Sequence, residues 1–339
     1  KAPRKLRAPP ALRGGRRAAA MAVEPSKAEA APLRRTLSRG LCAEIVSGGV
    51  AGCVAKTATA PLARLTVLSQ TSSLLAASKS AAAHSVAASQ GSFADGRIMS
   101  GLQHIVRNEG LAALWKGNVC TMVHRFPFTG VNFAVVEACK RCWPDLVQRH
   151  WWGRLIPGAA AACTAVAVCY PMEVVRTRVM ARAGGRHTRC AGWRRNLISL
   201  VHKEGPRGMY RGVGLSLAVT VPSLAISFGT YAVIQEQAVV MGLHESSFLV
   251  AFMAGGISGI VGSTLTFPLD VLRRRLQVMG MDASVPTRSW MHEAYHIFQK
   301  ESFAGFWRGI APELAKVFPT VALTFATYEQ LVPLVKHSR

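Results

Sequence analysis

The chain has 339 residues, of which 50% are hydrophobic, and its formal net charge is +24. Its mean hydropathy is +0.22, and soluble domains of this length rarely combine such apolarity with such a charge. The basic residues lie in an N-terminal segment and at the ends of apolar stretches. This distribution disfavours a nucleic-acid-binding face and favours contact with an anionic membrane surface.

The N-terminal segment, residues 1–40, differs from the rest of the chain. It holds 11 Lys and Arg residues but only two acids, Glu24 and Glu29. No apolar core of the signal-peptide type is present. We expect a basic disordered segment or an organelle transit peptide.

Six apolar stretches follow, each long enough, or nearly so, to cross about 30 Å of hydrocarbon. They cover residues 41–62, 118–139, 155–172, 213–234, 248–269 and 310–335. Each contains prolines, glycines or a few polar groups, as in helices that line a wet cavity. The alternative is six buried helices of a large soluble α-domain. The Ser- and Ala-rich stretch Thr71–Gly91 predicts a flexible loop.

A charged motif recurs at the end of every second stretch. Pro171-Met-Glu173-Val-Val-Arg176 and Pro268-Leu-Asp270-Val-Leu-Arg273 read Pro-x-acid-x-x-basic. Pro61-Leu-Ala63-Arg64-Leu-Thr66 is a degraded copy. Each proline is expected to kink its helix, because it removes a backbone donor and clashes with the preceding turn.

Two further landmarks follow this motif in each repeat, the first of them 33 residues after Pro171 and Pro268 but 48 after Pro61. An acidic residue and a closing glycine are 8 positions apart at Glu109…Gly117, Glu204…Gly212 and Glu301…Gly309. A proline follows each glycine by ten residues, at Pro127, Pro222 and Pro319. Markers in fixed register predict tandem repeats. We place these at residues 41–143, 152–238 and 246–336.

With these motifs, residues 40–335 resemble the mitochondrial carrier family. The resemblance implies an all-α membrane protein of six transmembrane helices, in three pseudo-threefold repeats around a central cavity. It also implies alternating access, a monomer and a location in the mitochondrial inner membrane, with plastid envelope and peroxisome as alternatives. Three short amphipathic helices are expected on the matrix side, near residues 96–108, 193–203 and 288–300.

The resemblance also implies a matrix gate of ion pairs between repeats. Glu173 is expected to pair with Arg273, whereas Asp270 would face Thr66 and Arg176 would face Ala63. Only one of three bridges is therefore complete. We expect Arg64, one position out of phase, to serve as a substitute partner for Asp270. Gln70 and Gln277, nine residues after Pro61 and Pro268, match the glutamine that the family places beneath the bridge.

A weaker gate is expected at the cytoplasmic end. The family pattern, aromatic-acid-x-x-basic, corresponds to Glu137 and Lys140, Tyr231 and Gln235, and Tyr328 and Glu329. No oppositely charged pair survives there, although Gln235 is placed to hydrogen-bond Glu329. We therefore expect the matrix-open state to be weakly latched.

The resemblance places the substrate contacts at equivalent heights on the second long helix of each repeat. They correspond to His124 and Arg125, to Val219 and Thr220, and to Lys316, with Glu313 one turn away on the same face. Cations on two helices indicate an anionic, phosphorylated substrate. The alternative is that Glu313 neutralises Lys316 internally. Val219 and Thr220 offer an apolar and hydroxyl surface for a base ring.

The wording of several motifs resembles the plant-type carriers of adenine nucleotides, coenzyme A and related cofactors. The resemblance rests on the His124-Arg125-Phe-Pro127 run, on Arg273-Arg274-Arg275-Leu-Gln277 and on Pro312-Glu313-Leu-Ala-Lys316. It implies transport of such a metabolite, most simply by exchange. The alternatives are another phosphorylated cofactor, such as thiamine diphosphate or adenosine bisphosphate, or a non-transporting membrane adaptor.

Enzymatic and metal chemistry find no support in the sequence. The chain shows no nucleophile, base and orienting group in a catalytic pattern, so we expect no enzyme and no cofactor. Cys139 and Cys142 form a lone Cys-x-x-Cys pair, which indicates two thiols at a helix end rather than a metal site. The expected partners are a small anionic substrate and membrane lipid, foremost cardiolipin.

Overall fold

A computed structural model of the chain describes residues 47–76, 98–143, 155–182, 193–242, 248–281 and 287–337. The chain divides into two units, residues 1–46 and 47–339, and the second is described here. Its described residues form helices and no strand, which confirms the all-α prediction. The predicted N-terminal segment 1–40 lies outside the described residues. The predicted loop Thr71–Gly91 is helical as far as Ala76, and its remainder also lies outside them.

The helices follow one pattern three times, a long helix, a short helix and a second long helix. The first repeat contains a helix over residues 47–58, α2 (Ala60–Ala76), α5 (Ile98–Glu109), the 3₁₀ helix η2 (Leu111–Trp115) and α6 (Asn118–Cys142). The second contains α8 (Leu155–Ala181), α9 (Trp193–Met209) and α10 (Val213–Val240). The third contains α11 (Phe248–Val278), α12 (Trp290–Glu301), the 3₁₀ helix η4 (Phe303–Trp307), α13 (Ile310–Ala315) and α14 (Val317–His337).

The short helices α5, α9 and α12 occupy the three positions expected for matrix-side helices. The amphipathic pattern has a clear structural basis in the first and third repeats. Ile105 of α5 packs on Leu65 and Leu68, and Ile297 of α12 packs on Phe267 and neighbouring residues of α11. Each short helix is thereby fixed to the long helix of its own repeat.

Three described helices are long and apolar enough to cross a membrane by length and composition, namely α8, α10 and α11. The other expected spans are interrupted or more polar. The first repeat breaks at Thr59 and the last at Lys316, between α13 and α14, while α6 carries Arg125 and Glu137. Polar groups in these helices fit walls that face one another rather than lipid alone.

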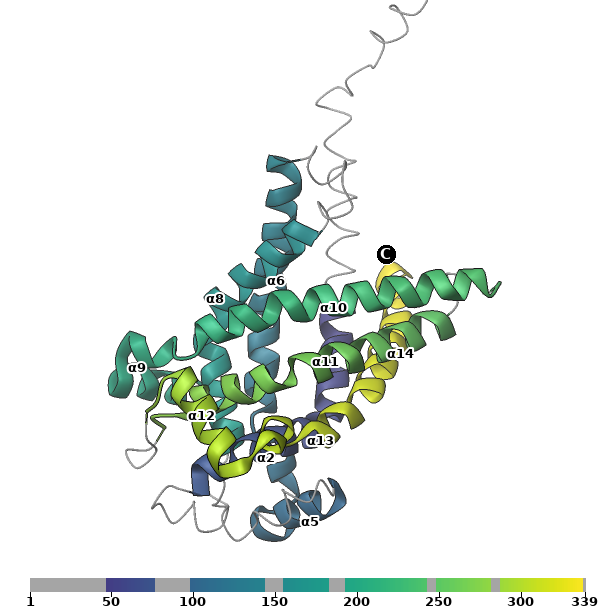
Figure 1. The fold of residues 1–339 in the computed structure, drawn as a ribbon. Coiled ribbons are helices and arrows are strands. Elements are labelled where there is room, and N and C mark those ends of the chain that lie inside the picture. The colour runs from purple at the N-terminus through teal and green to yellow at the C-terminus, as the bar shows by residue number, and fades with distance from the viewer. Residues whose placement is uncertain are drawn as a thin grey trace, which may run out of the picture. The chain divides into compact units, whose positions relative to one another are not determined.

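Neighbouring repeats pack through their long helices. α6 lies along α8, and α10 lies along α11, as Figure 1 shows for the second pair. Within the third repeat, α14 packs on α11, where Phe318 covers Gly256 so closely that an added Cβ would lie 2.3 Å from its ring. The Thr320 hydroxyl is 3.4 Å from the Thr59 hydroxyl, which links the last repeat to the first.

The closing glycines have a clear physical role. Gly117, Gly212 and Gly309 cap α6, α10 and α13 with φ of 87°, 84° and 88°, a left-handed conformation that other residues rarely adopt. Each also lies against the long helix of the next repeat that carries the Pro-x-acid-x-x-basic motif, namely α8, α11 and α2. Gly117 contacts Met180, Gly212 contacts Leu276, and Gly309 contacts Ser69.

Candidate substrate and gating site

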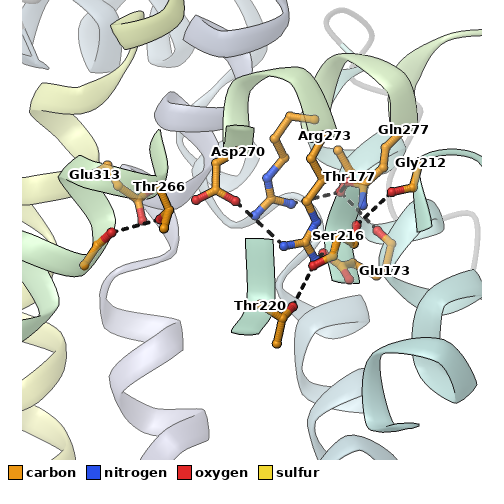
Figure 2. Close-up of polar contacts among 12 residues, drawn as sticks. Glu173, Thr177, Gly212, Ser216, Thr220, Thr266, Asp270, Arg273, Gln277 and Glu313 are labelled. Atoms are coloured by element: carbon orange, nitrogen blue, oxygen red, sulfur yellow. Dashed lines mark hydrogen bonds and ion pairs between the residues drawn. The ribbon is translucent and has the colours of Figure 1, made fainter. Parts of the chain in front are cut away.

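An ion pair joins α8 to α11 at the end of these helices that carries the Pro-x-acid-x-x-basic motif. Arg273 Nη2 donates to Oε1 of Glu173, and the two side chains are 14% and 9% exposed. Figure 2 shows them directed toward each other. Asp270 Oδ1 is 3.8 Å from Arg273 Nη1 on the same helix. The Glu173–Arg273 contact is the one complete bridge that the family pattern predicts.

Gln277 joins the polar groups beside this ion pair. Its Oε1 accepts a hydrogen bond from the Thr177 hydroxyl at 2.8 Å, and its Nε2 donates to the Tyr170 hydroxyl at 3.4 Å. Arg274 Nη1 donates to Thr177 at 3.1 Å. Gln70 behaves differently, because its side-chain oxygen is buried without a hydrogen-bond partner among the described residues.

The motif positions of the first repeat, Ala63 and Thr66, add no charge to this network. The prediction that Arg64 would pair with Asp270 is wrong. The fully buried Arg64 guanidinium donates from Nη2 to Oε2 of Glu109 at 2.8 Å and from Nη1 to the Ala113 carbonyl at 2.5 Å. One residue of displacement turns a side chain about 100° around a helix, so Arg64 leaves the face that Ala63 occupies.

Arg64 instead completes a threefold set of buried arginine–glutamate pairs. We call the pairs Arg64–Glu109, Arg178–Glu204 and Arg275–Glu301 the arginine clamp. Arg178 donates to both oxygens of Glu204, and Arg275 donates to those of Glu301 at 2.7 and 2.9 Å. The glutamates are the acids of the second sequence landmark, which the sequence located without indicating their partners.

A basic residue directly before each closing glycine supports the glutamate of the same repeat. Lys116, Arg211 and Arg308 lie 3.6, 3.7 and 3.0 Å from Glu109, Glu204 and Glu301. Burial raises the pKa of Glu301, but the hydrogen bonds and charge of Arg275 outweigh it, so this pKa lies below its usual value. Burial lowers the pKa of Lys116, against the opposing charge of Glu109.

The clamp also binds each repeat to the next. From the first repeat, Arg64 Nη2 donates to the Arg182 carbonyl at 3.4 Å, and the neighbouring Lys116 Nζ donates to the same carbonyl at 2.9 Å. From the second, Arg178 Nη2 donates to the Met279 carbonyl at 3.0 Å. From the third, Arg275 Nε donates to the Gln70 carbonyl at 3.0 Å. These contacts run from repeat one to two, two to three, and three back to one, so they close a ring.

Lys316 and Glu313 form an ion pair of 2.5 Å within the third repeat. The expectation that they share one face is met, and in this state Glu313 is the direct partner of Lys316. Lys316 lies where α13 ends, and its carbonyl accepts bonds from the Thr320 amide and hydroxyl. The helix break therefore positions the ammonium group.

His124 and Arg125 lie half-buried on α6. The His124 ring lies 5.4 Å from that of Phe128, centroid to centroid. The Arg125 guanidinium covers Gly52, where an added Cβ would lie 3.1 Å from Nη2. Arg125 Nε is buried and has no hydrogen-bond partner among the described residues. The glycine-rich stretch of the first helix thus makes room for an arginine.

Val219 and Thr220 are less available than the sequence suggests. Val219 is 3% exposed, packed between α10 and its neighbours. The Thr220 hydroxyl donates to the Ser216 carbonyl at 2.7 Å, as Figure 2 shows. In this state neither offers the open surface expected for a base ring, because the packing of α10 against α8 and α11 covers this height of the helix.

Lys56 is a candidate site residue that our sequence reasoning missed. It lies five positions before Pro61 in the first apolar stretch, and it interacts electrostatically with Lys316, Arg176, Arg125 and Glu313. No ion pair joins it to a carboxylate within the described residues. The available signal was a lysine inside an apolar span, which is costly in a membrane unless it serves a function.

The residues of the opposite gate form no hydrogen bond or ion pair between helices in the described part of the chain. Glu137 pairs with Arg141 on its own helix at 3.2 Å, and Lys140 is exposed. The expected bond from Gln235 to Glu329 is not formed. Gln235 Nε2 donates to the Tyr231 hydroxyl at 3.2 Å, one turn away on α10, and Glu329 is exposed. Tyr328 is half-buried on α14.

Comparison with known proteins gives this geometry a family context. The sequence profile described as "Mitochondrial carrier protein" matches residues 38–146, 147–240 and 244–339. A mitochondrial adenine nucleotide transporter of Arabidopsis thaliana is 32% identical over 321 residues, covering 86% of this chain and 87% of its own. A mitochondrial adenyl nucleotide antiporter of Danio rerio is 28% identical over 85% of this chain, which spans 57% of that longer relative.

A third relative carries a different cofactor in its name. A mitochondrial thiamine pyrophosphate carrier of Sclerotinia sclerotiorum is 30% identical over 246 residues, covering 69% of this chain and 75% of its own. The three profile matches together extend over nearly all of the residues that the structure describes. The chain belongs to the mitochondrial carrier family.

Proposed function

We propose that the protein carries an anionic nucleotide-type metabolite across the mitochondrial inner membrane by alternating access, as an exchanger. The observation that carries this proposal is the group of cations formed by Lys56, Arg125 and Lys316. They come from the first helix, from α6 and from the start of α14, and they interact electrostatically. Only Lys316 has a carboxylate partner among the described residues. Unpaired cations at membrane depth are costly, and a phosphorylated substrate would offset that cost.

The gating contacts support the alternating-access part of the proposal. Glu173 and Arg273 are paired across helices, whereas the hydrogen bonds and ion pairs of the opposite gate residues in the described chain stay within their own helices. This arrangement fits a state closed toward the matrix and open toward the cytosol. Substrate must then weaken the Glu173–Arg273 pair relative to the opposite gate, since a ligand shifts an equilibrium only through unequal affinity for the two states.

Adenine nucleotides, or coenzyme A, are the leading substrate class. Two of the relatives reported above are named for adenine or adenyl nucleotides. His124, whose ring is tilted by 32° against that of Phe128, adds an aromatic surface beside Arg125. Val219 and Thr220 would contact the substrate only after α10 repacks. The thiamine-type relative makes thiamine diphosphate the second candidate, because it shares the diphosphate that such cations bind.

Reconstitution tests the proposal directly. Liposomes loaded with ADP, ATP, AMP, coenzyme A, adenosine 3′,5′-bisphosphate or thiamine diphosphate are assayed for uptake of the same labelled compound. We expect exchange of at least one adenine nucleotide and loss of most of it in Lys316→Ala. Lys300→Ala, an exposed change on α12, is the matched control and should retain exchange. Failure of the wild type with every compound would leave a membrane adaptor as the function.

The lipid partner is expected to be cardiolipin, with the protein acting as a monomer. α6 and α10 begin at glycines without a side-chain cap, so their first amide groups remain available to phosphate. Exchange measured with and without cardiolipin in the liposomes tests this. Equal rates and equal thermal stability in both would argue against it.

A further inference from the structure

The structure leaves one half-buried arginine of the matrix gate, Arg176, without its partner. Arg176 occupies the same motif position in α8 as Arg273 does in α11. Arg273 finds the acid of the preceding repeat, Glu173, but the corresponding acid for Arg176 is replaced by Ala63. α2, which carries Ala63, packs on α8, so the missing carboxylate belongs to this interface.

Nothing in the described chain replaces that carboxylate. The Nε atom of Arg176 is buried without a hydrogen-bond partner, and no ion pair joins its guanidinium to an acid of the described residues. The acids that act on it most strongly are Glu173 and Glu313. Both are already engaged, by Arg273 and by Lys316. Arg176 is therefore a surplus charge.

The surroundings increase this excess rather than relieve it. A central cluster of charged residues interacts electrostatically around Arg176, and it holds six cations and three carboxylates. The cations are Lys56, Arg125, Arg176, Arg273, Arg274 and Lys316, and the carboxylates are Glu173, Asp270 and Glu313. Arg274 is bonded to the Thr177 hydroxyl and not to an acid among the described residues. The cations of the cluster therefore outnumber its carboxylates by three.

We propose that a phosphate group of the substrate binds Arg176 and takes the place of the carboxylate that Ala63 does not supply. This inference rests on the proposed function and specifies its mechanism. A guanidinium donates two parallel hydrogen bonds to phosphate as it does to a carboxylate, so the substitution is chemically direct. Lys56, which interacts with Arg176, can bind a second phosphate oxygen. The substrate class is a nucleotide whose phosphate oxygens reach Arg176 and Lys56.

The consequence for gating is specific to this chain. Without substrate, the described residues of the matrix side hold one ion pair between repeats, Glu173–Arg273. A phosphate bound to Arg176 neutralises the charge that Ala63 leaves unpaired where α2 packs on α8. Restoring an acid at position 63 should therefore compete with the phosphate inside the protein. The half-exposed Ala63 side chain leaves room for that change.

The test compares Ala63→Asp with Ala63→Asn, which has the same shape without the charge, and with Arg176→Gln. Exchange of labelled ADP is measured in cardiolipin liposomes, and ligand-induced thermal stabilisation is measured with ADP, AMP and inorganic pyrophosphate. We expect Ala63→Asp and Arg176→Gln to raise the KM for ADP about tenfold or more, the loss of one charge-assisted phosphate contact. Ala63→Asn should stay within about twofold. Ala63→Asp should also unfold at a higher temperature than the wild type without ligand.

The outcomes separate this inference from the proposed function. If the wild type exchanges ADP and Ala63→Asp does so with an unchanged KM, the phosphate does not bind Arg176, although the carrier function stands. If the wild type exchanges no nucleotide, the carrier function falls, and pyrophosphate stabilisation that Ala63→Asp abolishes still supports the phosphate site. Pyrophosphate stabilisation that is equal in wild type, Ala63→Asp and Arg176→Gln would overturn the site itself.

Discussion

Exchanging residues 64 and 68 tests whether the first repeat keeps its arginine clamp by moving the arginine one helical turn. In the second and third repeats the clamp arginine lies seven residues after the proline, at Arg178 and Arg275. The corresponding residue of the first repeat is Leu68, and Arg64 lies four residues before it. Residues four apart share a helix face, so Arg64 reaches Glu109 from the next turn.

The displaced arginine makes fewer bonds than its two counterparts. The Nε atoms of Arg178 and Arg275 donate to the Gln277 and Gln70 carbonyls, each nine residues after a proline in the next repeat. The Nε atom of Arg64 is buried with no partner in the described chain. The position that corresponds to those carbonyls is Met180. An arginine at position 68 should recover this bond.

The variant Arg64→Leu shows how much the Arg64–Glu109 pair contributes to the free energy of unfolding. It breaks a pair in which Arg64 is fully buried and Glu109 is 9% exposed, and Lys116 at 3.6 Å remains as partial compensation. Breaking a buried pair costs about 3–5 kcal/mol, and the remaining lysine places this case near 3 kcal/mol. At 2–4 °C for each kcal/mol, the unfolding midpoint should fall by roughly 6–12 °C.

The double variant Arg64→Leu, Leu68→Arg should regain at least half of that loss. Leu68→Arg alone should also destabilise, because two guanidinium groups then compete for one carboxylate and a core leucine is lost. Unfolding of the detergent-solubilised protein is followed with a thiol-reactive dye, which detects the buried Cys120 and Cys169.

Arg107→Leu, an exposed arginine of α5, controls for loss of charge and should shift the midpoint little. A double variant no more stable than Arg64→Leu would refute the argument that the two positions are equivalent. An Arg64→Leu midpoint within about 2 °C of the wild type would refute the estimated strength of the pair.

Three further predictions follow from the same geometry. Ser302 has φ 59° and ψ −171°, at a position where the other two repeats have glycine. The variant Ser302→Gly should relieve about 1–2 kcal/mol of backbone strain and raise the unfolding midpoint. An unchanged or lower midpoint would show that no strain is stored there. Arg275 depresses the pKa of Glu301, so this pair stabilises the protein above the carboxyl's unfolded pKa of about 4.3 and loses that effect as pH falls through the lower folded value. Glu301→Gln should therefore be less stable at pH 7 and lose less than the wild type on acidification to about pH 3.5; parallel pH curves would contradict this. Gln235→Lys should give Glu329 an ion-pair partner in the matrix-open state. A cysteine introduced into the central cluster should then react faster with a thiol reagent added on the matrix side. If that cysteine is already fully labelled from the matrix side in the wild type without substrate, the weak cytoplasmic latch is contradicted.

Much of the fold could be predicted because its markers are local and periodic. The Glu-to-Gly spacing and the ten-residue interval to Pro127, Pro222 and Pro319 follow from turns and caps that each repeat must form independently. The Glu173–Arg273 contact could be predicted because a pseudo-threefold arrangement converts one motif into pairs between neighbours.

The errors concern contacts that depend on helix facing and on state. Arg64 was assigned by its distance from the gate in sequence, whereas its helix face directs it to Glu109. Val219 is buried by the packing of α10, which one sequence does not reveal. Gln235 bonds to Tyr231 on its own helix and not to Glu329, and a sequence carries no statement about which gating state is populated.

The first repeat shows that the clamp and the gate are separate devices. It has lost the gate charges at Ala63 and Thr66 but retains its clamp through Arg64. Clamp arginines hold a glutamate beside a short matrix helix and a backbone carbonyl of the next repeat, so they fix how the repeats join. The gate ion pair between Glu173 and Arg273 joins α8 to α11 and includes none of the carbonyls that the clamp arginines bind. Loss of Arg64 should therefore lower stability in both gating states, whereas loss of Arg273 should mainly shift their balance.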